Sequence, residues 1–129
     1  MIPQCIDQGI GVIPWSPLAR GMLTGNRTRS GEKLTTRAQS DAFAESLYTA
    51  DDFDVVEAAD AVASERGVPT AQVSLAWLLH KPGVTAPIVG ATKLQHLDDA
   101  LAAEQLSLSE AEIARLEERY LPHAVVGHE

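Results

Sequence analysis

Two short apolar runs, separated by a long stretch without periodicity, constrain the fold of this chain most strongly. The first run is Ile10–Trp15 and the second is Ala86–Val89, and both are rich in branched side chains. Runs this short and this apolar are typical of strands that are buried on both faces of a sheet. Because helical patterns fill most of the remaining chain, we expect parallel strand pairing through crossover connections.

Helical spacing of apolar residues predicts a helix before the first run and a pair of helices between the runs. Residues 1–9 are expected to form a short helical tail. From Asp51 the apolar residues recur on one helical face until Gly67, a residue favoured at helix ends. Another helix is expected over Ala71–His80 with Thr70 as its N-cap. It is apolar on nearly every side, which is typical of a buried helix.

Two later helices carry capping signatures at their first residues. Thr92 and Gln95 fit a capping box, and Ser109 and Glu112 fit a second one. The apolar residues expected to face inward are Leu94, Leu97 and Leu101 on the first of these helices and Ile113, Leu116 and Tyr120 on the second.

Two strands cannot form a sheet that is covered on both faces, so the strand count limits the fold class. A closed barrel of eight parallel strands needs roughly 250 residues, whereas this chain has 129. We therefore expect an α/β fold that is the C-terminal part of a (β/α)8 TIM barrel, comprising the last two strand–helix units plus a terminal helix. Residues 1–123 would form this partial barrel, and residues 124–129 a flexible tail.

Composition and charge argue against several classes of protein. The net charge of −8 argues against a general binder of nucleic acid or of an anionic membrane. The single cysteine, Cys5, excludes an internal disulfide and favours a reducing compartment. The sequence contains no apolar run long enough to span a bilayer and no signal-peptide pattern at its start, so we expect a cytoplasmic protein.

The first candidate site follows the first apolar run, over residues 15–21. Ligands of parallel α/β folds bind at the C-terminal ends of strands. This end offers the ring of Trp15, which can stack on a flat ligand, and the guanidinium of Arg20, which pairs well with phosphate. From the residues alone, a buried tryptophan followed by an ordinary loop is the simpler alternative.

The second candidate site follows the second run, over residues 90–93, where small residues precede a helix. The free N–H groups and the positive dipole of a helix N-terminus attract anions, and Lys93 and His96 would add donors. The alternative is a capped helix with a surface lysine. We call the segments that follow the two runs, residues 15–21 and 90–93, the two exits. Together they could hold the two ends of a dinucleotide. Arg37 in the long loop could close over it, unless it is simply a solvated side chain.

At this point a family resemblance becomes specific. Gly11–Gly25 resembles the seventh-strand region of the aldo-keto reductases, most closely that of the bacterial branch related to the potassium-channel β subunits. Ala71–Trp77 resembles the next helix of that family, and Pro87–Leu97 resembles its eighth strand and cofactor helix. The resemblance runs from residue 1 to about 123. It implies a (β/α)8 barrel that transfers hydride from NADPH to aldehydes and ketones.

The resemblance also implies a set of cofactor-binding residues. Trp15 would stack on the nicotinamide. The residues lining the pyrophosphate would be Ser16, Pro17, Leu18, Arg20 and Gly21, and those around the adenosine and its 2′-phosphate would be Gly90, Ala91, Thr92, Lys93, His96 and Asp99. Asn26, His96 and Ala100 depart from the usual family pattern, which leaves the choice between NADP and NAD open.

The catalytic Asp, Tyr, Lys and His of the family lie on earlier strands, so no catalytic residue is expected here. Tyr48 and Tyr120, the only tyrosines, do not match the catalytic position, and no metal-ligand spacing is present. We expect the chain to bind NADP(H), and to act on a small carbonyl substrate only when the rest of a barrel completes it. The alternatives are a non-catalytic nucleotide-binding module or a self-associating one, because open strand edges invite pairing.

Overall fold

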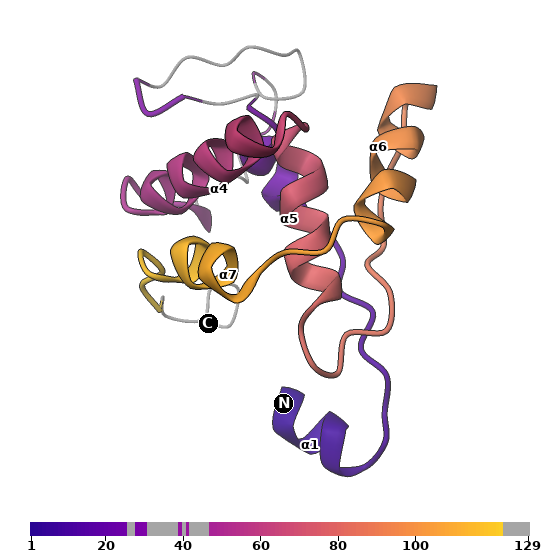
Figure 1. Cartoon of the computed structure of the whole chain (residues 1–129). Helices are drawn as coiled ribbons and strands as arrows, with labels where there is room; N and C mark the ends of the chain where they lie inside the picture. The colour runs from indigo at the N-terminus through magenta and orange to yellow at the C-terminus, as the bar shows by residue number, and fades with distance from the viewer. Residues whose placement is uncertain (26–27, 31–38, 40, 42–46, 123–129) are drawn as a thin grey trace.

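The computed structural model describes residues 1–25, 28–30, 39, 41 and 47–122 (Figure 1). The described elements are, in chain order, α1 (Ile2–Asp7), the short 3-10 helix η1 (Ala19–Thr24), α4 (Asp52–Arg66), α5 (Thr70–Leu79), α6 (Leu94–Glu104) and α7 (Glu110–Glu117). Helices α4, α5 and α7 pack together, α6 contacts α5, and α1 lies at the opposite end of the molecule from α4 (Figure 1). Within this described part, none of the helices has the length and apolarity needed to cross a bilayer.

A small core between three helices holds the described part together. Its buried members are Ala59, Val62 and Ala63 from α4, Val73 and Ala76 from α5, and Leu108 and Leu116 from the α7 region. The α4 members belong to the face that the apolar spacing predicts, so this prediction is confirmed. The predicted burial of α5 is also confirmed, because four consecutive residues of this helix, 73–76, are buried.

The end of α4 and the start of α7 are tied to each other. Gly67 ends α4 in the left-handed conformation. The capping box predicted for Ser109 and Glu112 is present, since the Ser109 N–H donates to Glu112 Oε2 at 2.7 Å and the Glu112 N–H donates to Ser109 Oγ at 3.3 Å. The Arg66 guanidinium also donates to both carboxylate oxygens of Glu112. One carboxylate therefore caps α7 and fixes α7 to α4.

The two apolar runs lie side by side and point in the same direction. Isolated parallel bridges join Val12 to Val84 and Trp15 to Ile88. The Val12 N–H donates to Gly83 O at 3.0 Å, and Val12 O accepts from the Thr85 N–H at 2.8 Å. The approach is close enough that a Cβ at position 11 would collide with the Thr85 hydroxyl, so any other residue there would force the Thr85 side chain to move.

The predicted strands over residues 10–15 and 86–89 are reduced to these bridges. Each run pairs only with the other among the described residues, and two separate bridges do not make a continuous ladder. The direction of pairing is as predicted, but the strand lengths are not. The reason is that a strand buried on both faces takes much of its regularity from neighbours on both sides.

Several predicted helix details are wrong. Thr70 is the first residue of α5 and not its cap, and its hydroxyl donates to Asp60. The capping box of Thr92 and Gln95 is not formed, because α6 begins after Lys93, which makes no side-chain cap. The residues expected to face inward but found exposed are Leu94, Leu97, Leu101 and Tyr120. The α6 stripe is exposed because none of the described elements packs over it, whereas Leu116 is buried as predicted.

A core substitution should separate the buried helical residues from the exposed stripe. Val62 is fully buried, and Val62→Ala should lower the free energy of unfolding by about 2 kcal/mol, from lost burial plus a cavity. Leu101→Ala, at a side chain that is 58% exposed, should change it by less than about 0.5 kcal/mol. Urea unfolding followed by far-UV circular dichroism measures both. Equal losses for the two variants would contradict the core described here.

The tie between α4 and α7 should depend on pH. The hydrogen bonds from Arg66, and then those from Ser109, hold the pKa of Glu112 well below its ordinary value of 4.5. A carboxylate with a lowered folded-state pKa stabilises the fold above its unfolded pKa, and this contribution is lost as the pH falls through the folded value.

Glu112→Gln should therefore destabilise the chain near neutral pH, and its difference from the wild type should shrink as the pH falls below about 4.5. Glu104→Gln, at an exposed carboxylate on α6, is the control and should show little difference at any pH. Thermal melts across this pH range measure the effect. A Glu112→Gln difference that is constant with pH would contradict the assigned role.

Candidate functional site

The two exits begin at the same end of the paired runs. Trp15 forms a parallel bridge with Ile88, and the Ile88 N–H donates to Pro14 O at 2.8 Å. Residues 16–21 start directly after the first partner of this bridge, and residues 90–93 start two positions after the second. The sequence-based expectation that one elongated ligand meets both exits therefore agrees with the backbone geometry.

Trp15 presents its ring to solvent at this edge. Its side chain is 67% exposed, so the simpler alternative of a buried tryptophan is wrong for the described chain. Ile13 and Ile88 are also exposed, at 60% and 53%. An indole held at a backbone bridge and open on one side can stack on a flat heteroaromatic ring.

The turn after Trp15 has an unusual backbone. Ser16, Ala19 and Arg20 all have positive φ, at 51°, 48° and 53°, which is costly for residues with a Cβ. The turn is held by internal hydrogen bonds, from the Ala19 N–H to Ser16 O and from the Gly21 N–H to Leu18 O. Met22, only 2% exposed, is the buried residue of η1, which packs against α5 and so attaches the turn to the helical core. Strain of this kind concentrates at ligand sites, where the surrounding packing maintains it.

Arg20 is held by an acidic partner from the long loop. Its Nε donates to Asp41 Oδ2 at 2.8 Å and its Nη2 donates to Asp41 Oδ1 at 3.0 Å, a two-point pairing. Asp41 is buried, and its hydrogen bond raises the pKa of Arg20 above the ordinary value. Tyr48 adds a smaller electrostatic effect in the same direction. An incoming phosphate would have to share this guanidinium with Asp41 or displace it.

The second exit is open at the start of α6. The residues of this exit, all exposed, are Gly90, Ala91, Thr92 and Lys93. Lys93 is the N-cap in extended conformation, and no side chain caps the helix there. The first turn of an 11-residue helix therefore presents its positive end toward solvent beside the Lys93 and His96 side chains.

Asp99 is fixed one turn further along α6. The Gln72 amide of α5 donates to Asp99 Oδ1 at 2.9 Å, and the Gln95 amide donates to the same oxygen at 3.1 Å. These contacts orient the carboxylate and attach α6 to α5. The Gln95 amide thus bonds to a side chain one turn along α6 and not to the N-terminal backbone of the helix.

The bridge between Trp15 and Ile88 places the starts of the two groups of predicted residues at the same end of the paired runs. The first group is Trp15, Ser16, Pro17, Leu18, Arg20 and Gly21, and the second is Gly90, Ala91, Thr92, Lys93, His96 and Asp99. Arg37 and Asn26 lie outside the described residues. No set of three or more potential metal ligands comes together in the described part of the chain.

Sequence reasoning missed Asp41 and Gln72. Asp41 lies in a loop without periodicity, so no pattern indicates which arginine it contacts. Gln72 carries a detectable signal, because it is a polar side chain near the start of an otherwise apolar helix. A polar group in such a position needs a hydrogen-bond partner, but the sequence does not indicate which residue provides it.

Comparison with known proteins gives the family of the chain. The sequence profile described as Aldo/keto reductase family matches residues 1–120. The chain belongs to the aldo/keto reductase family. Members of this family fold as (β/α)8 barrels, and the parallel pairing with helices beside it is part of such an architecture.

Relatives of this aldo/keto reductase chain are named as reductases or as putative aryl-alcohol dehydrogenases. It is 42% identical over 131 residues to the aldo-keto reductase NECHADRAFT_45914 of Fusarium vanettenii, covering 99% of the chain and 34% of the relative. It is 41% identical over 127 residues to the aldo-keto reductase dtxS3 of Metarhizium robertsii, covering 96% and 33%. With versiconal hemiacetal acetate reductase of Aspergillus parasiticus it shares 36% identity over 126 residues, covering 97% and 36%. The chain thus spans about one third of the length of these relatives.

A substitution to glycine should be tolerated at a position with positive φ but should destabilise the chain in the middle of a helix. Ala19→Gly relieves left-handed strain of about 1 kcal/mol but adds flexibility to the unfolded chain. The free energy of unfolding should therefore stay the same or rise by up to about 1 kcal/mol. Ala61→Gly, at an exposed position of α4, should cost about 1 kcal/mol. Urea unfolding curves compare them. A larger loss from Ala19→Gly than from Ala61→Gly would contradict the strained turn.

Proposed function

We propose that this chain is the C-terminal, nucleotide-binding part of an NADPH-dependent aldo-keto reductase that reduces aldehydes and ketones. The single observation that carries the proposal is the Trp15–Ile88 bridge, which sets the two exits side by side. Family membership supports an oxidoreductase, because the matched relatives are named reductases or dehydrogenases. The resemblance of Gly11–Gly25 supports the branch related to the potassium-channel β subunits, and we infer a cytoplasmic location.

The residues at the two exits have distinct binding roles in this proposal. Trp15 stacks on the nicotinamide, and the backbone bridge to Ile88 fixes where its side chain leaves the paired runs. The turn at 16–21 follows the pyrophosphate, where Arg20 supplies positive charge if Asp41 shares or releases it. The uncapped start of α6 and Lys93 receive the 2′-phosphate, and Asp99, fixed by Gln72, accepts hydrogen bonds from the adenosine.

The bound dinucleotide supplies the hydride for the carbonyl carbon. The carbonyl oxygen then needs a proton from a positioned side chain. Tyr120 is exposed after α7, Tyr48 acts on the charge of Arg20, and neither matches the position of the family's catalytic tyrosine. We therefore assign the proton donor to a part of the barrel beyond this chain, and no catalytic role to the residues here.

A second candidate function is a nucleotide-binding module without catalysis. The observation that favours it is that the described exits provide a stacking ring and an anion site, while neither of the two tyrosines matches the catalytic position of the family. The two candidates share the nucleotide site and differ in whether carbonyl reduction appears when the rest of a barrel is supplied.

Titration with NADPH tests the nucleotide site directly. Stacking should quench the Trp15 fluorescence of the chain, because the nicotinamide covers the exposed indole face. Trp15→Phe, which leaves Trp77 on α5 in place, is the control and should abolish the quenching. Absence of quenching by the wild type at millimolar NADPH would count against the site in both candidate functions.

The charge at the second exit should set the preference for NADPH over NADH. Lys93→Ala should weaken NADPH binding by roughly tenfold, since it removes one charged hydrogen bond to the 2′-phosphate, and should leave NADH binding almost unchanged. Arg119→Ala, which removes an exposed positive charge beyond α7, should affect neither cofactor. Fluorescence titrations give the dissociation constants. Equal losses for NADH and NADPH would contradict the assignment of Lys93 to the 2′-phosphate.

A further inference from the structure

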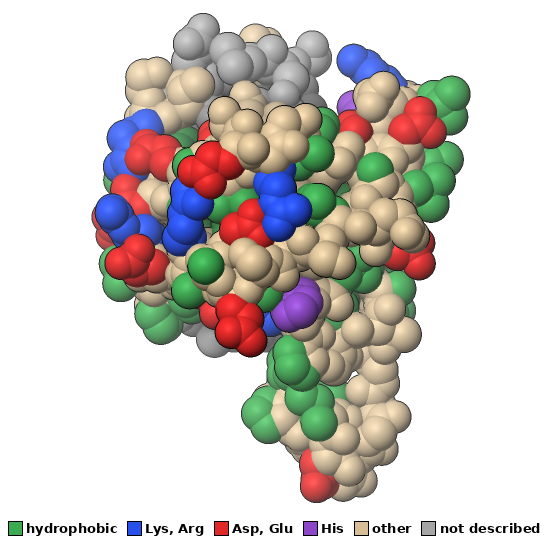
Figure 2. Space-filling view, viewed as in Figure 1, with side chains coloured by type: hydrophobic (Ala, Val, Ile, Leu, Met, Phe, Trp, Pro, Cys, Tyr) green, Lys and Arg blue, Asp and Glu red, His purple; other side chains and the backbone are tan. Residues whose placement is uncertain are grey.

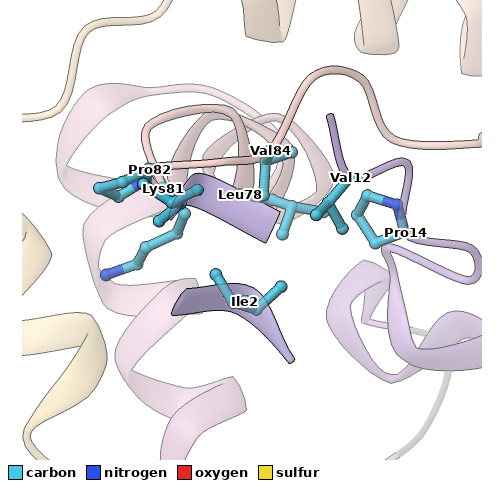
Figure 3. A pocket seen from close by; sticks show the side chains of 8 residues that line it. Ile2, Val12, Pro14, Leu78, Lys81, Pro82 and Val84 are labelled. Atoms are coloured by element: carbon cyan, nitrogen blue, oxygen red, sulfur yellow. The ribbon is translucent and has the colours of Figure 1, made fainter. Parts of the chain in front are cut away.

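Helix α5 lies against the paired runs at one end and holds α6 at the other. Near its C-terminus it lines an apolar hollow under the paired runs, and Leu78, Val12 and Val84 are among the lining residues (Figure 3). Near its N-terminus, the Gln72 amide donates to Asp99 Oδ1 of α6 at 2.9 Å. The contact between Gln72 and Asp99 therefore connects the second exit to the same helix that supports the first.

Asp99 is held by neutral amides and not by a cation. Its Oδ1 accepts hydrogen bonds from Gln72 and from Gln95. Charged side chains gather over α4 and α7 (Figure 2), where Arg66 and Arg115 form ion pairs with carboxylates. Among the described residues, no ion pair of this kind includes Asp99. Its carboxylate is therefore fixed in place without its charge being neutralised by a salt bridge.

Fixing one oxygen of Asp99 determines what the other oxygen can bind. An ionised carboxylate accepts hydrogen bonds through both oxygens and donates none. Both amides bond to Oδ1, which leaves Oδ2 without a hydrogen-bond partner among the described residues. Asp99 is half-buried, and His96 precedes it by three residues, so the two side chains are neighbours on α6. A ligand at the second exit thus meets an oriented acceptor that favours a hydrogen-bond donor.

We propose that Gln72 is a positioning residue that makes the second exit selective for adenine, by holding Asp99 so that its Oδ2 accepts from the exocyclic amine of the base. The inference rests on the proposed function and names the residue that sets its base selectivity. Adenine presents a donor at this amine, whereas hypoxanthine carries a carbonyl oxygen there, which the carboxylate repels. Asp99 follows Lys93 by six residues, about 9 Å along the helix axis, so a nucleoside whose phosphate binds at Lys93 can reach it with its base.

The two amides that hold Asp99 differ in what fixes them. Gln95 is exposed and lies on α6 itself, one turn before Asp99, so it moves with the carboxylate. Gln72 is half-buried and comes from another helix, where the next residue, Val73, is fully buried in the core. Gln72 therefore fixes the carboxylate relative to the helical core, which Gln95 cannot do. A neutral amide does this without cancelling the charge that the base amine is attracted to.

Titrations with NADPH and with its hypoxanthine analogue, in which an oxygen replaces the exocyclic amine, test the proposal. Quenching of Trp15 fluorescence gives both dissociation constants. The wild type should bind NADPH roughly tenfold more tightly than the analogue, which is the effect of one hydrogen bond to a charged group. Gln72→Leu keeps the size of the side chain but removes the amide, and should bring this ratio close to one. Gln105→Leu, at an exposed amide just after α6, is the matched control and should keep the wild-type ratio.

A reversed pair separates positioning of the carboxylate from simple attachment of α6 to α5. Gln72→Glu alone places two carboxylates against each other and turns Asp99 away. Asp99→Asn alone leaves an amide that can turn either end toward the ligand, so each single substitution should lower the selectivity. In the combined variant, the new amide donates to the new carboxylate and its oxygen faces the base. This combination should recover most of the wild-type ratio, which a merely structural contact would not do.

The outcomes distinguish this inference from the proposed function. If neither nucleotide quenches the wild type, the nucleotide site is refuted and the inference is refuted with it. If NADPH binds but Gln72→Leu weakens both nucleotides equally, Gln72 only attaches α6, and the nucleotide site stands without the positioning role. A wild type that does not distinguish the two bases, or a combined variant no more selective than its parts, also overturns the inference. The wild-type ratio and the combined variant keep the test decisive even if Gln72→Leu does not fold.

Discussion

The parallel contact between residues 12–15 and 84–88 places the starts of the two candidate segments, residues 15–21 and 90–93, at the same end of the paired runs. It consists of two bridges and the hydrogen bonds of Val12 and Ile88, and Gly11 leaves room for the Thr85 side chain opposite it. Parallel direction matters because it places both exits at one edge, where antiparallel pairing would have sent them to opposite ends. The strained turn after Trp15 and the start of α6 meet the same ligand only under this condition.

Helix α5 connects that contact to the rest of the molecule. Its Val73 and Ala76 belong to the core with α4 and α7, and its Leu78 lines the hollow under the paired runs. Its Gln72 also holds Asp99 on α6. The helical core is therefore the best-packed part of the described chain. Because α5 contacts both the paired runs and α6, it positions both exits relative to this core. The paired runs themselves contribute little burial, since their outer side chains are exposed.

The sequence allowed prediction of features that depend on short-range chemistry. The helical face of α4, the stop at Gly67 and the capping box at Ser109 follow from spacing and local hydrogen bonding, and the structure has all three. The parallel direction of the two runs followed from the alternation of strands and helices. The exposure of the α6 leucines did not, because an amphipathic pattern indicates that a face needs a cover and not whether the described chain supplies one.

The candidate site shows the same division. The position of Trp15 and of the α6 N-terminus could be predicted, since both follow directly from strand ends. The pairing of Arg20 with Asp41 could not, because the two residues are joined by a loop whose sequence has no period. The choice of Asp99 as the partner of Gln72 depends on how α5 and α6 cross, which is a property of tertiary packing.

A nuclear magnetic resonance titration tests most directly whether one ligand spans both exits. The indole N–H of Trp15 and the backbone amides of residues 93–95 are followed as NADPH is added. This account predicts that both sets of signals shift with one common dissociation constant, and that the adenosine bisphosphate half of the cofactor shifts only the second set. Shifts in one set alone with the complete cofactor, or two different dissociation constants, would contradict it.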